Sequence, residues 1–61
     1  MSVPKDPFML LSWTNMKLRD SYSSLEELGY GENIRPEEIL NTLKAAGYRY
    51  SEETNSFISG T

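Results

Sequence analysis

The stretch from Lys5 to Asp20 constrains the fold most, because it is the longest helical pattern and the most apolar part of the chain. Asp6 followed by Pro7 is a helix-start signal. Aspartate can accept hydrogen bonds from the free N–H groups of a first turn, and proline at the first helical position lacks only a bond that would be missing there anyway. From Pro7 to Asp20 there is no glycine, no further proline and a single β-branched residue, Thr14. The sequence therefore predicts one long helix ending near Asp20.

The apolar side chains of this helix cover an unusually wide arc. At about 100° per residue, one broad face is predicted to contain Leu18, Leu11, Asn15, Phe8, Ser12, Met16 and Met9. Trp13 lies at the edge of that face, and Leu10 lies almost opposite it. Two interpretations stay open: a central helix contacted on several sides, or a helix that offers Trp13 and Leu10 to a second copy or another protein. Asn15 is expected to bind the backbone of a neighbouring turn, because a buried amide left unpaired costs on the order of 1–3 kcal/mol.

A second, short helix is predicted after a turn at residues 21–22. Its start is marked by either of two capping boxes, Ser23 with Glu26 or Ser24 with Glu27. Leu25 and Leu28 are one turn apart and are expected to point inward. Gly29 and Gly31 are expected to stop this helix, with Tyr30 packed over its end.

A third helix is predicted to begin at Pro36, again at the first helical position. Arg35 is a poor capping residue, so Asn33 is expected to cap this helix instead, with Ile34 buried as an apolar anchor. Gly47 is expected to end the helix. The predicted inward stripe consists of Ile39, Leu40, Leu43 and Ala46.

The last segment changes period, and its alternation predicts a β-hairpin. Residues 48–50 and 56–58 would form the strands, and a type I turn with Asn55 in the left-handed region would close them. Tyr48, Tyr50 and Phe57 would then share the face that packs on the helices, which a two-stranded hairpin needs in order to form. The predicted fold is mostly α with a small C-terminal β-hairpin, a three-helix, winged helix-turn-helix-like single domain. Its predicted limits are residues 6–58, between an arm (1–5) and a frayed tail (59–61).

Length and composition narrow the function. Sixty-one residues make one domain, which buries only about 60% of its unfolded surface, so association with a second copy would supplement its core. Without cysteine or histidine, the chain lacks thiolate metal sites and the commonest metal ligand and general base. No apolar run approaches the roughly 20 residues of a membrane span, and no signal-peptide pattern opens the chain, so a cytoplasmic location is expected. A net charge of −3 makes nucleic acid a poor first guess as a partner.

Several short motifs also resemble a known family. They are Lys5-Asp6-Pro7, Leu10-Leu11-Ser12, Asn15-x-Lys17-Leu18-Arg19-Asp20, Ser24-Leu25, Glu37-Glu38, Gly47-Tyr48-x-Tyr50 and Asn55-x-Phe57. Together they cover roughly Pro4 to Ile58 and resemble domain-of-unknown-function family 4250, a small bacterial family. The chain departs from that family's pattern at residues 29–31 and 35–36. The resemblance implies fold boundaries and supplies no activity, cofactor or catalytic residue.

A winged helix-turn-helix suggests DNA binding by the third helix, with Arg35, Asn41, Thr42 and Lys44 as contacts. The start of that helix carries Glu37 and Glu38, which would face phosphates, and the hairpin tip carries Glu52 and Glu53. Weak nucleic-acid binding or a transcription-associated role is therefore the alternative prediction. Catalysis is not expected, because adjacent carboxylates diverge on a helix, and Ser12 and Thr14 have no histidine to activate them.

The preferred prediction is a protein–protein interaction module, acting on a protein partner or as a homodimer, without metal or cofactor. Tryptophan and tyrosine dominate interface hot spots. The predicted partner-binding residues are Leu10, Trp13, Tyr22 and Tyr30.

Overall fold

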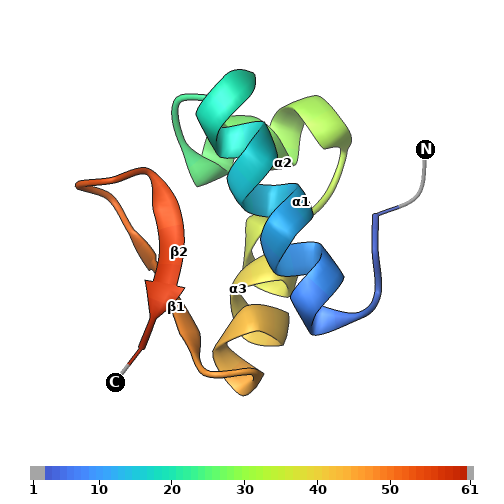
Figure 1. The fold of residues 1–61 in the computed structure, drawn as a ribbon. Helices are drawn as coiled ribbons and strands as arrows, with labels where there is room; N and C mark the ends of the chain where they lie inside the picture. Colours follow the sequence, from blue (N-terminus) through green and yellow to red (C-terminus); the bar gives the residue numbers. More distant parts are fainter. Residues whose placement is uncertain (1–2, 61) are drawn as a thin grey trace.

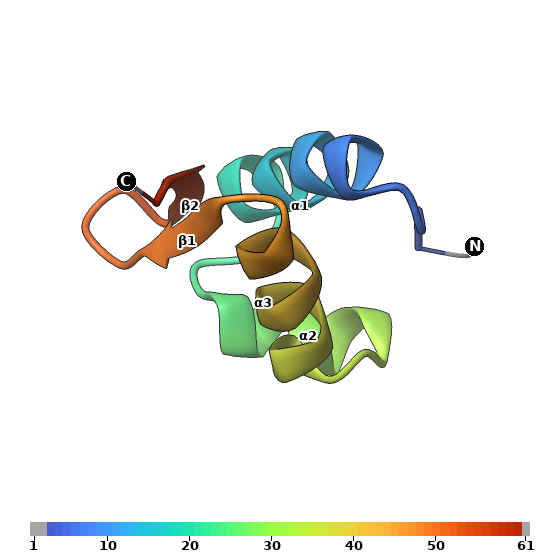
Figure 2. The ribbon, with the colours of Figure 1, turned by 90° about the horizontal axis from the view of Figure 1, so that it is seen from below.

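The computed structural model describes residues 3–60, which form three helices followed by a two-stranded antiparallel hairpin (Figure 1). The helices are α1 (Pro7–Asp20), α2 (Leu25–Glu32) and α3 (Pro36–Ala45), and the strands are β1 (Tyr48–Ser51) and β2 (Ser56–Ser59). In Figure 2, α3 lies between α1 and α2, and the hairpin stands at one side of the helices. In the hairpin, β2 contacts α1 and β1 contacts α3. The predicted mostly helical domain with a C-terminal hairpin is confirmed, and its element order is compatible with a winged helix-turn-helix.

Helix α1 begins and ends as predicted. A carboxylate oxygen of Asp6 accepts hydrogen bonds from the N–H groups of Phe8 at 3.1 Å and Met9 at 3.0 Å. Pro7 occupies the first turn, and the N–H of Ser21 closes the last turn by donating to the carbonyl of Lys17 at 2.8 Å. These caps satisfy backbone groups that a helix leaves unpaired at its ends, so both boundaries follow from local sequence.

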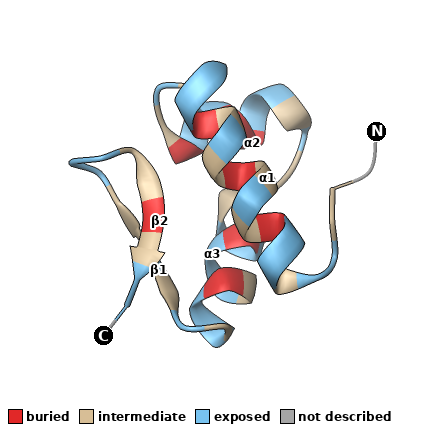
Figure 3. Ribbon diagram, in the orientation of Figure 1, coloured by how far each residue is buried: buried red, intermediate tan, exposed pale blue. Residues whose placement is uncertain are grey.

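The inward face of α1 differs from the predicted one (Figure 3). The helix buries Leu10, Thr14 and Leu18, whereas Phe8, Met9 and Met16 are exposed. The prediction was wrong because apolar residues occur on nearly every side of this helix, so their number does not define a direction. The core residues that do define it come from α2, α3 and β2: Leu25, Leu28, Ile39, Leu43 and Phe57.

Thr14 is fully buried, and its hydroxyl has no hydrogen-bond partner among the described residues. An unpaired buried hydroxyl is unfavourable, and valine has nearly the same shape and helix propensity. Replacing Thr14 by valine is therefore expected to raise the free energy of unfolding by about 1 kcal/mol. Urea denaturation followed by circular dichroism measures the change, with Thr42→Val at a half-buried position of α3 as the matched control. A destabilised Thr14→Val variant would show that the hydroxyl is satisfied.

Helix α2 continues through the glycines that were expected to stop it. The side chain of Ser24 caps its start by accepting from the N–H of Glu27 at 3.1 Å, and the helix ends at Glu32. Its C-cap is Asn33, in the left-handed region at φ 58°. Asparagine tolerates that conformation better than most residues, and the following N–H of Ile34 donates to the carbonyl of Gly29 at 2.8 Å.

The two glycines permit close contacts instead. A Cβ atom on Gly29 would lie 2.7 Å from the carbonyl oxygen of Ile34 and 2.7 Å from a ring carbon of Pro36. A Cβ atom on Gly31 would lie 2.3 Å from the hydroxyl of Tyr22. Glycine therefore lets α2 approach both the connection to α3 and the segment that follows α1.

The connection from α2 to α3 also corrects three predictions. Tyr30 is 91% exposed and does not pack over the helix end. Asn33 caps the end of α2, so Arg35 is the N-cap of α3 and makes no side-chain capping bond. Ile34 is only half-buried, although it packs against the core.

Helix α3 buries Ile39 and Leu43 as predicted, but its buried stripe is narrower than the predicted one. Leu40 is 38% exposed and Ala46 is half-buried. After the helix, Gly47 adopts φ 95°, a conformation that glycine reaches without a Cβ penalty. This turn sends the chain directly into β1.

The hairpin forms as predicted, and Asn55 adopts the left-handed region at φ 50°. In its register, Tyr50 lies opposite Phe57. The rings of Tyr50 and Phe57 are 5.5 Å apart, and Tyr48, Tyr50 and Phe57 all belong to the core-facing side. Ser59 closes β2, and the N–H of Gly60 donates to the carbonyl of Gly47 at 2.8 Å, so the predicted frayed tail does not include residues 59 and 60. Residue 61, and residues 1–2 of the predicted arm, lie outside the described part of the chain.

Two asparagines attach the hairpin to α1. The amide of Asn15 donates to the carbonyl of Phe57 at 3.2 Å and accepts from its N–H at 2.7 Å. Asn15 therefore binds backbone, as expected, but the backbone of β2 rather than that of a neighbouring turn. Asn55 donates to the carbonyls of Leu18 at 3.1 Å and Tyr22 at 3.0 Å, at the end of α1. The Asn15 amide thus pairs with the backbone of β2 as a neighbouring strand would. The Asn55 amide pairs with carbonyls at the end of α1 as a helix cap would.

Candidate interaction surfaces

The most apolar exposed surface lies on α1. Phe8 is 65% exposed, Met9 63% and Met16 44%, and Ser12 is exposed between them. Residues 8, 12 and 16 are four apart, so they form one line along the helix, with Met9 beside it. We call these four residues the α1 outer face. It points away from the core residues Leu10, Thr14 and Leu18 because it occupies the opposite side of the helix.

Of the predicted partner-binding residues on α1, Leu10 is in the core and only 4% exposed. It therefore cannot act as a surface anchor, since its side chain fills the space between α1 and α3. Trp13 is half-buried and packs against the core, with the ammonium nitrogen of Lys17 5.8 Å from its ring centroid. The side chain of Trp13 therefore contacts the core and is also partly exposed to solvent.

Tyr22 belongs to a small polar cluster between α1 and α2. Its hydroxyl donates to a carboxylate oxygen of Glu32 at 2.7 Å, and the same oxygen lies 3.7 Å from the ammonium nitrogen of Lys17. The hydrogen bond to Glu32, followed by burial and the carboxylate charge, raises the pKa of Tyr22 above its usual value of 10.0. Through Lys17, this cluster also joins Tyr22 to Trp13.

This cluster predicts that Tyr22 ionises above its usual pKa of 10.0. Its phenol is protonated when it donates to Glu32, so the stabilising contribution is present below pH 10 and is lost as the pH rises through the raised pKa of the folded state. Spectrophotometric titration of the wild type minus that of Tyr22→Phe gives the curve of this one group. Glu32→Gln should move the midpoint back towards 10, and a midpoint at or below 10 in the wild type would contradict the assignment.

Tyr30, the fourth predicted anchor, extends into solvent from the last turn of α2. At 91% exposed it has an environment unlike that of Trp13 or Tyr22, so the structure does not gather the four predicted residues into one surface. It connects Trp13 to Tyr22 only through Lys17 and Glu32, buries Leu10 and leaves Tyr30 exposed at the surface.

The predicted nucleic-acid contacts are spread along α3. Arg35 precedes its first turn, Lys44 is in its last turn, and Asn41 and Thr42 lie between them. Arg35, Asn41 and Lys44 are exposed, and Thr42 is half-buried. Exposed carboxylates flank these groups at Glu37 and Glu38 on α3 and at Glu52 and Glu53 in the hairpin turn. Such charges oppose the approach of a phosphate backbone.

Residues 3–60 contain no cluster of three or more carboxylates that could hold a metal ion. Within the same residues, no helix has the length and apolar character needed to cross a membrane.

These features define a small helical domain with a C-terminal hairpin and an apolar helix face left uncovered. A family model described as "Domain of unknown function (DUF4250)" matches residues 4–57, and the chain belongs to this family. The match confirms the resemblance found in the sequence motifs. No curated protein and no solved structure matches the chain.

Sequence reasoning missed the α1 outer face, because Phe8, Met9 and Met16 were assigned to the inward side. One signal could have found it. Leu10, Leu11 and Leu18 lie in one arc with Thr14, and rigid leucines favour a core more than flexible methionines do. The direction of α1 follows from the kind of apolar residue, whereas the prediction used their number.

Proposed function

We propose that this protein is a small interaction module that self-associates through the α1 outer face and acts by binding, without catalysis. The observation that carries the proposal is the exposure of Phe8, Met9 and Met16 on one side of one helix. Exposed apolar groups that are scattered singly are ordinary, but three on the same face of a helix form a continuous contact surface. Burying this surface would also supplement the small core of a 61-residue chain.

The α1 outer face is complementary to a second copy of itself. A two-fold axis through Ser12 would pair two α1 helices antiparallel, and Phe8 of one copy would then meet Met16 of the other. Sulfur–aromatic contacts of this kind are favourable, and a small residue at the crossing point lets two helices approach closely. The face is thus self-complementary, as a two-fold interface requires.

The ends of α1 favour an antiparallel pair of helices over a parallel one. Lys5 and Asp6 precede the helix, and Arg19 and Asp20 end it. With the axis at Ser12, Lys5 would lie near Arg19 of the second copy, whose charge is offset by its own ion pair with Asp20 at 2.9 Å. The helix dipoles would also run in opposite directions. A parallel pair would instead place each charged end next to an identical one.

Sedimentation equilibrium of the wild type and two variants tests the proposal. A weak dimer, with a dissociation constant on the order of 10⁻⁵ M, is expected for a contact of this size. Met16→Glu places a charge in the centre of each contact and is expected to give a monomer over the same concentrations. Tyr30→Glu changes a still more exposed side chain outside α1, so this control is expected to sediment like the wild type.

Three results would contradict the proposal. The wild type could remain monomeric at millimolar concentration, Met16→Glu could associate as strongly as the wild type, or only Tyr30→Glu could dissociate. The last result would move the contact to the end of α2. Circular dichroism of each variant verifies that the substitution leaves the fold intact, since both side chains are outside the core.

A further inference from the structure

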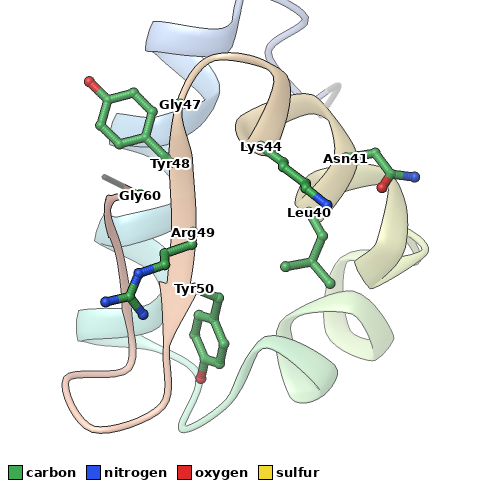
Figure 4. Close-up of a pocket in the computed structure, with 8 residues that line it drawn as sticks. All are labelled: Leu40, Asn41, Lys44, Gly47, Tyr48, Arg49, Tyr50 and Gly60. Carbon is green, nitrogen blue, oxygen red and sulfur yellow. The ribbon is translucent and has the colours of Figure 1, made fainter.

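A second candidate surface, besides the α1 outer face, lies between α3 and β1. A groove of about 680 Å³ separates these elements, lined by Leu40, Asn41 and Lys44 of α3 and by Tyr48, Arg49 and Tyr50 of β1 (Figure 4). In Figure 4, the side chains of Leu40 and Lys44 extend from α3, whereas those of Tyr48 and Arg49 extend from β1 on the side away from α3. Its residues are all different from those of the α1 outer face, so it is a separate surface.

The strand side of this groove is an unpaired sheet edge. Phe57 directs its N–H and carbonyl to Asn15, away from β1, so the facing residues Tyr50 and Phe57 form a non-hydrogen-bonded pair. The backbone orientation alternates along a strand, so Tyr48, two residues before Tyr50, has the same orientation as Tyr50. The N–H and carbonyl groups of Tyr48 and Tyr50 therefore point away from β2, on the outer edge of the two-stranded sheet.

A second hollow of about 550 Å³ adjoins this groove and shares Leu40 and Tyr50 with it. The two ends have opposite charge. Lys44 and Arg49 line the first hollow, whereas Glu26, Glu37 and Glu52 line the second. A free strand edge, an apolar centre and two oppositely charged ends thus follow one another along the same groove.

We propose that this groove binds an extended peptide segment, which adds a strand to β1 and runs antiparallel to it. Strand addition at an open edge is a general way of recognising peptides, in which backbone bonds give affinity and flanking side chains give specificity. An antiparallel peptide starts at the acidic end and finishes at the basic end. It therefore needs basic residues at its N-terminal side, alternating apolar residues in the middle and acidic residues at its C-terminal side.

A second copy of the same strand fits this edge poorly. Antiparallel pairing of two β1 edges through Tyr48 and Tyr50 would place Arg49 directly opposite Arg49 of the second copy. Like charges directly opposite each other destabilise a sheet. The edge therefore favours a peptide with charges complementary to the groove, and this inference goes beyond the self-association proposed above.

Two synthetic peptides with the same composition test the proposal: acetyl-KRTVTVDE-amide and the charge-exchanged acetyl-DETVTVKR-amide. Each is titrated into ¹⁵N-labelled protein at low salt, and the amide shifts and amide-exchange rates are followed. The first peptide is expected to bind, with a dissociation constant on the order of 10⁻⁴ M, and to protect the amides of Tyr48 and Tyr50 from exchange. The second is expected to bind at least about 10-fold more weakly, because each of its ends would meet like charge.

A matched pair of variants connects binding to the groove. Lys44→Glu removes the positive charge at the basic end and is expected to weaken binding of the first peptide at least about 10-fold. Arg35→Glu makes the same change before the first turn of α3, outside this groove, and is expected to change binding less than about 2-fold. Both side chains are exposed, so both variants should fold.

Each other outcome overturns the proposal. No shifts with either peptide at about 1 mM would show that the edge does not accept a strand. Tighter binding of the charge-exchanged peptide would show the opposite strand direction. Shifts on α1 without protection of Tyr48 and Tyr50 would place the peptide on another surface, and equal losses in Lys44→Glu and Arg35→Glu would show non-specific attraction.

Discussion

Replacing Asn55 by alanine is expected to lower the free energy of unfolding by about 3 kcal/mol, because this one side chain connects three segments of the chain. Its amide nitrogen donates to the carbonyls of Leu18 and Tyr22, and its oxygen accepts from the hydroxyl of Tyr50 at 2.5 Å. Alanine removes these bonds and leaves two partly buried carbonyls at the end of α1 unpaired. It also tolerates the left-handed backbone at φ 50° less well than asparagine does.

The companion variant Asn55→Gly separates the two contributions. Glycine keeps the left-handed backbone but loses the same hydrogen bonds, so it should be more stable than the alanine variant by about 1 kcal/mol. Urea denaturation measures all three proteins. A free energy of unfolding for Asn55→Ala within about 0.5 kcal/mol of the wild type would show that the hairpin is held to α1 by apolar packing alone.

Replacing Leu43 by alanine is expected to cost about 3–4 kcal/mol, which for a domain of this size leaves much of the chain unfolded. Leu43 is fully buried, so its truncation loses apolar burial. It also opens a cavity in the core that α3 shares with α1, α2 and β2. Amide dispersion in the ¹⁵N NMR spectrum and the urea midpoint are the measurements.

Leu40 provides the matched control, since it is on the same helix and 38% exposed. Leu40→Ala should cost no more than about 1 kcal/mol, because its side chain is already partly in water. Similar losses for both variants would mean that Leu40 is as central to the core as the sequence stripe predicted. That result would contradict the burial described here.

The helix boundaries of α1 and α3 could be predicted because the physics that sets them is local. Asp6 with Pro7, Pro36 and Gly47 act within one turn of their own position. The hairpin followed in the same way from alternation and from Asn55 in a conformation that asparagine tolerates.

Positions that depend on distant contacts could not be predicted in this way. Gly29 and Gly31 look like helix breakers in isolation, yet each is glycine because another segment lies against it: the 34–36 connection and Tyr22. Asn33 shows a signal that was assigned to the wrong helix, since asparagine suits a left-handed C-cap as well as an N-cap.

The candidate surfaces show the same division. The contacts of Trp13 and Tyr22 with Lys17 and Glu32 form only after α1 and α2 pack together. The α1 outer face was hidden in the sequence because apolar residues surround the helix, and the groove beside β1 depends on strand register. The α1 outer face could have been recognised from the kinds of apolar residue within one helix, whereas the groove required the fold, because its residues come from both α3 and β1.

Disulfide trapping at Ser12 tests the central claim, self-association through α1, most directly. The chain contains no cysteine, so Ser12→Cys introduces a single thiol at the centre of the proposed two-fold contact, and Glu26→Cys introduces one on α2 as a control. A disulfide requires Cα atoms about 4.4–6.8 Å apart, which a crossing at Ser12 would provide. In a glutathione redox buffer, Ser12→Cys is expected to form a covalent dimer in preference to the mixed disulfide, and Glu26→Cys is not. Equal dimer yields for the two variants, or none for Ser12→Cys, would contradict the account.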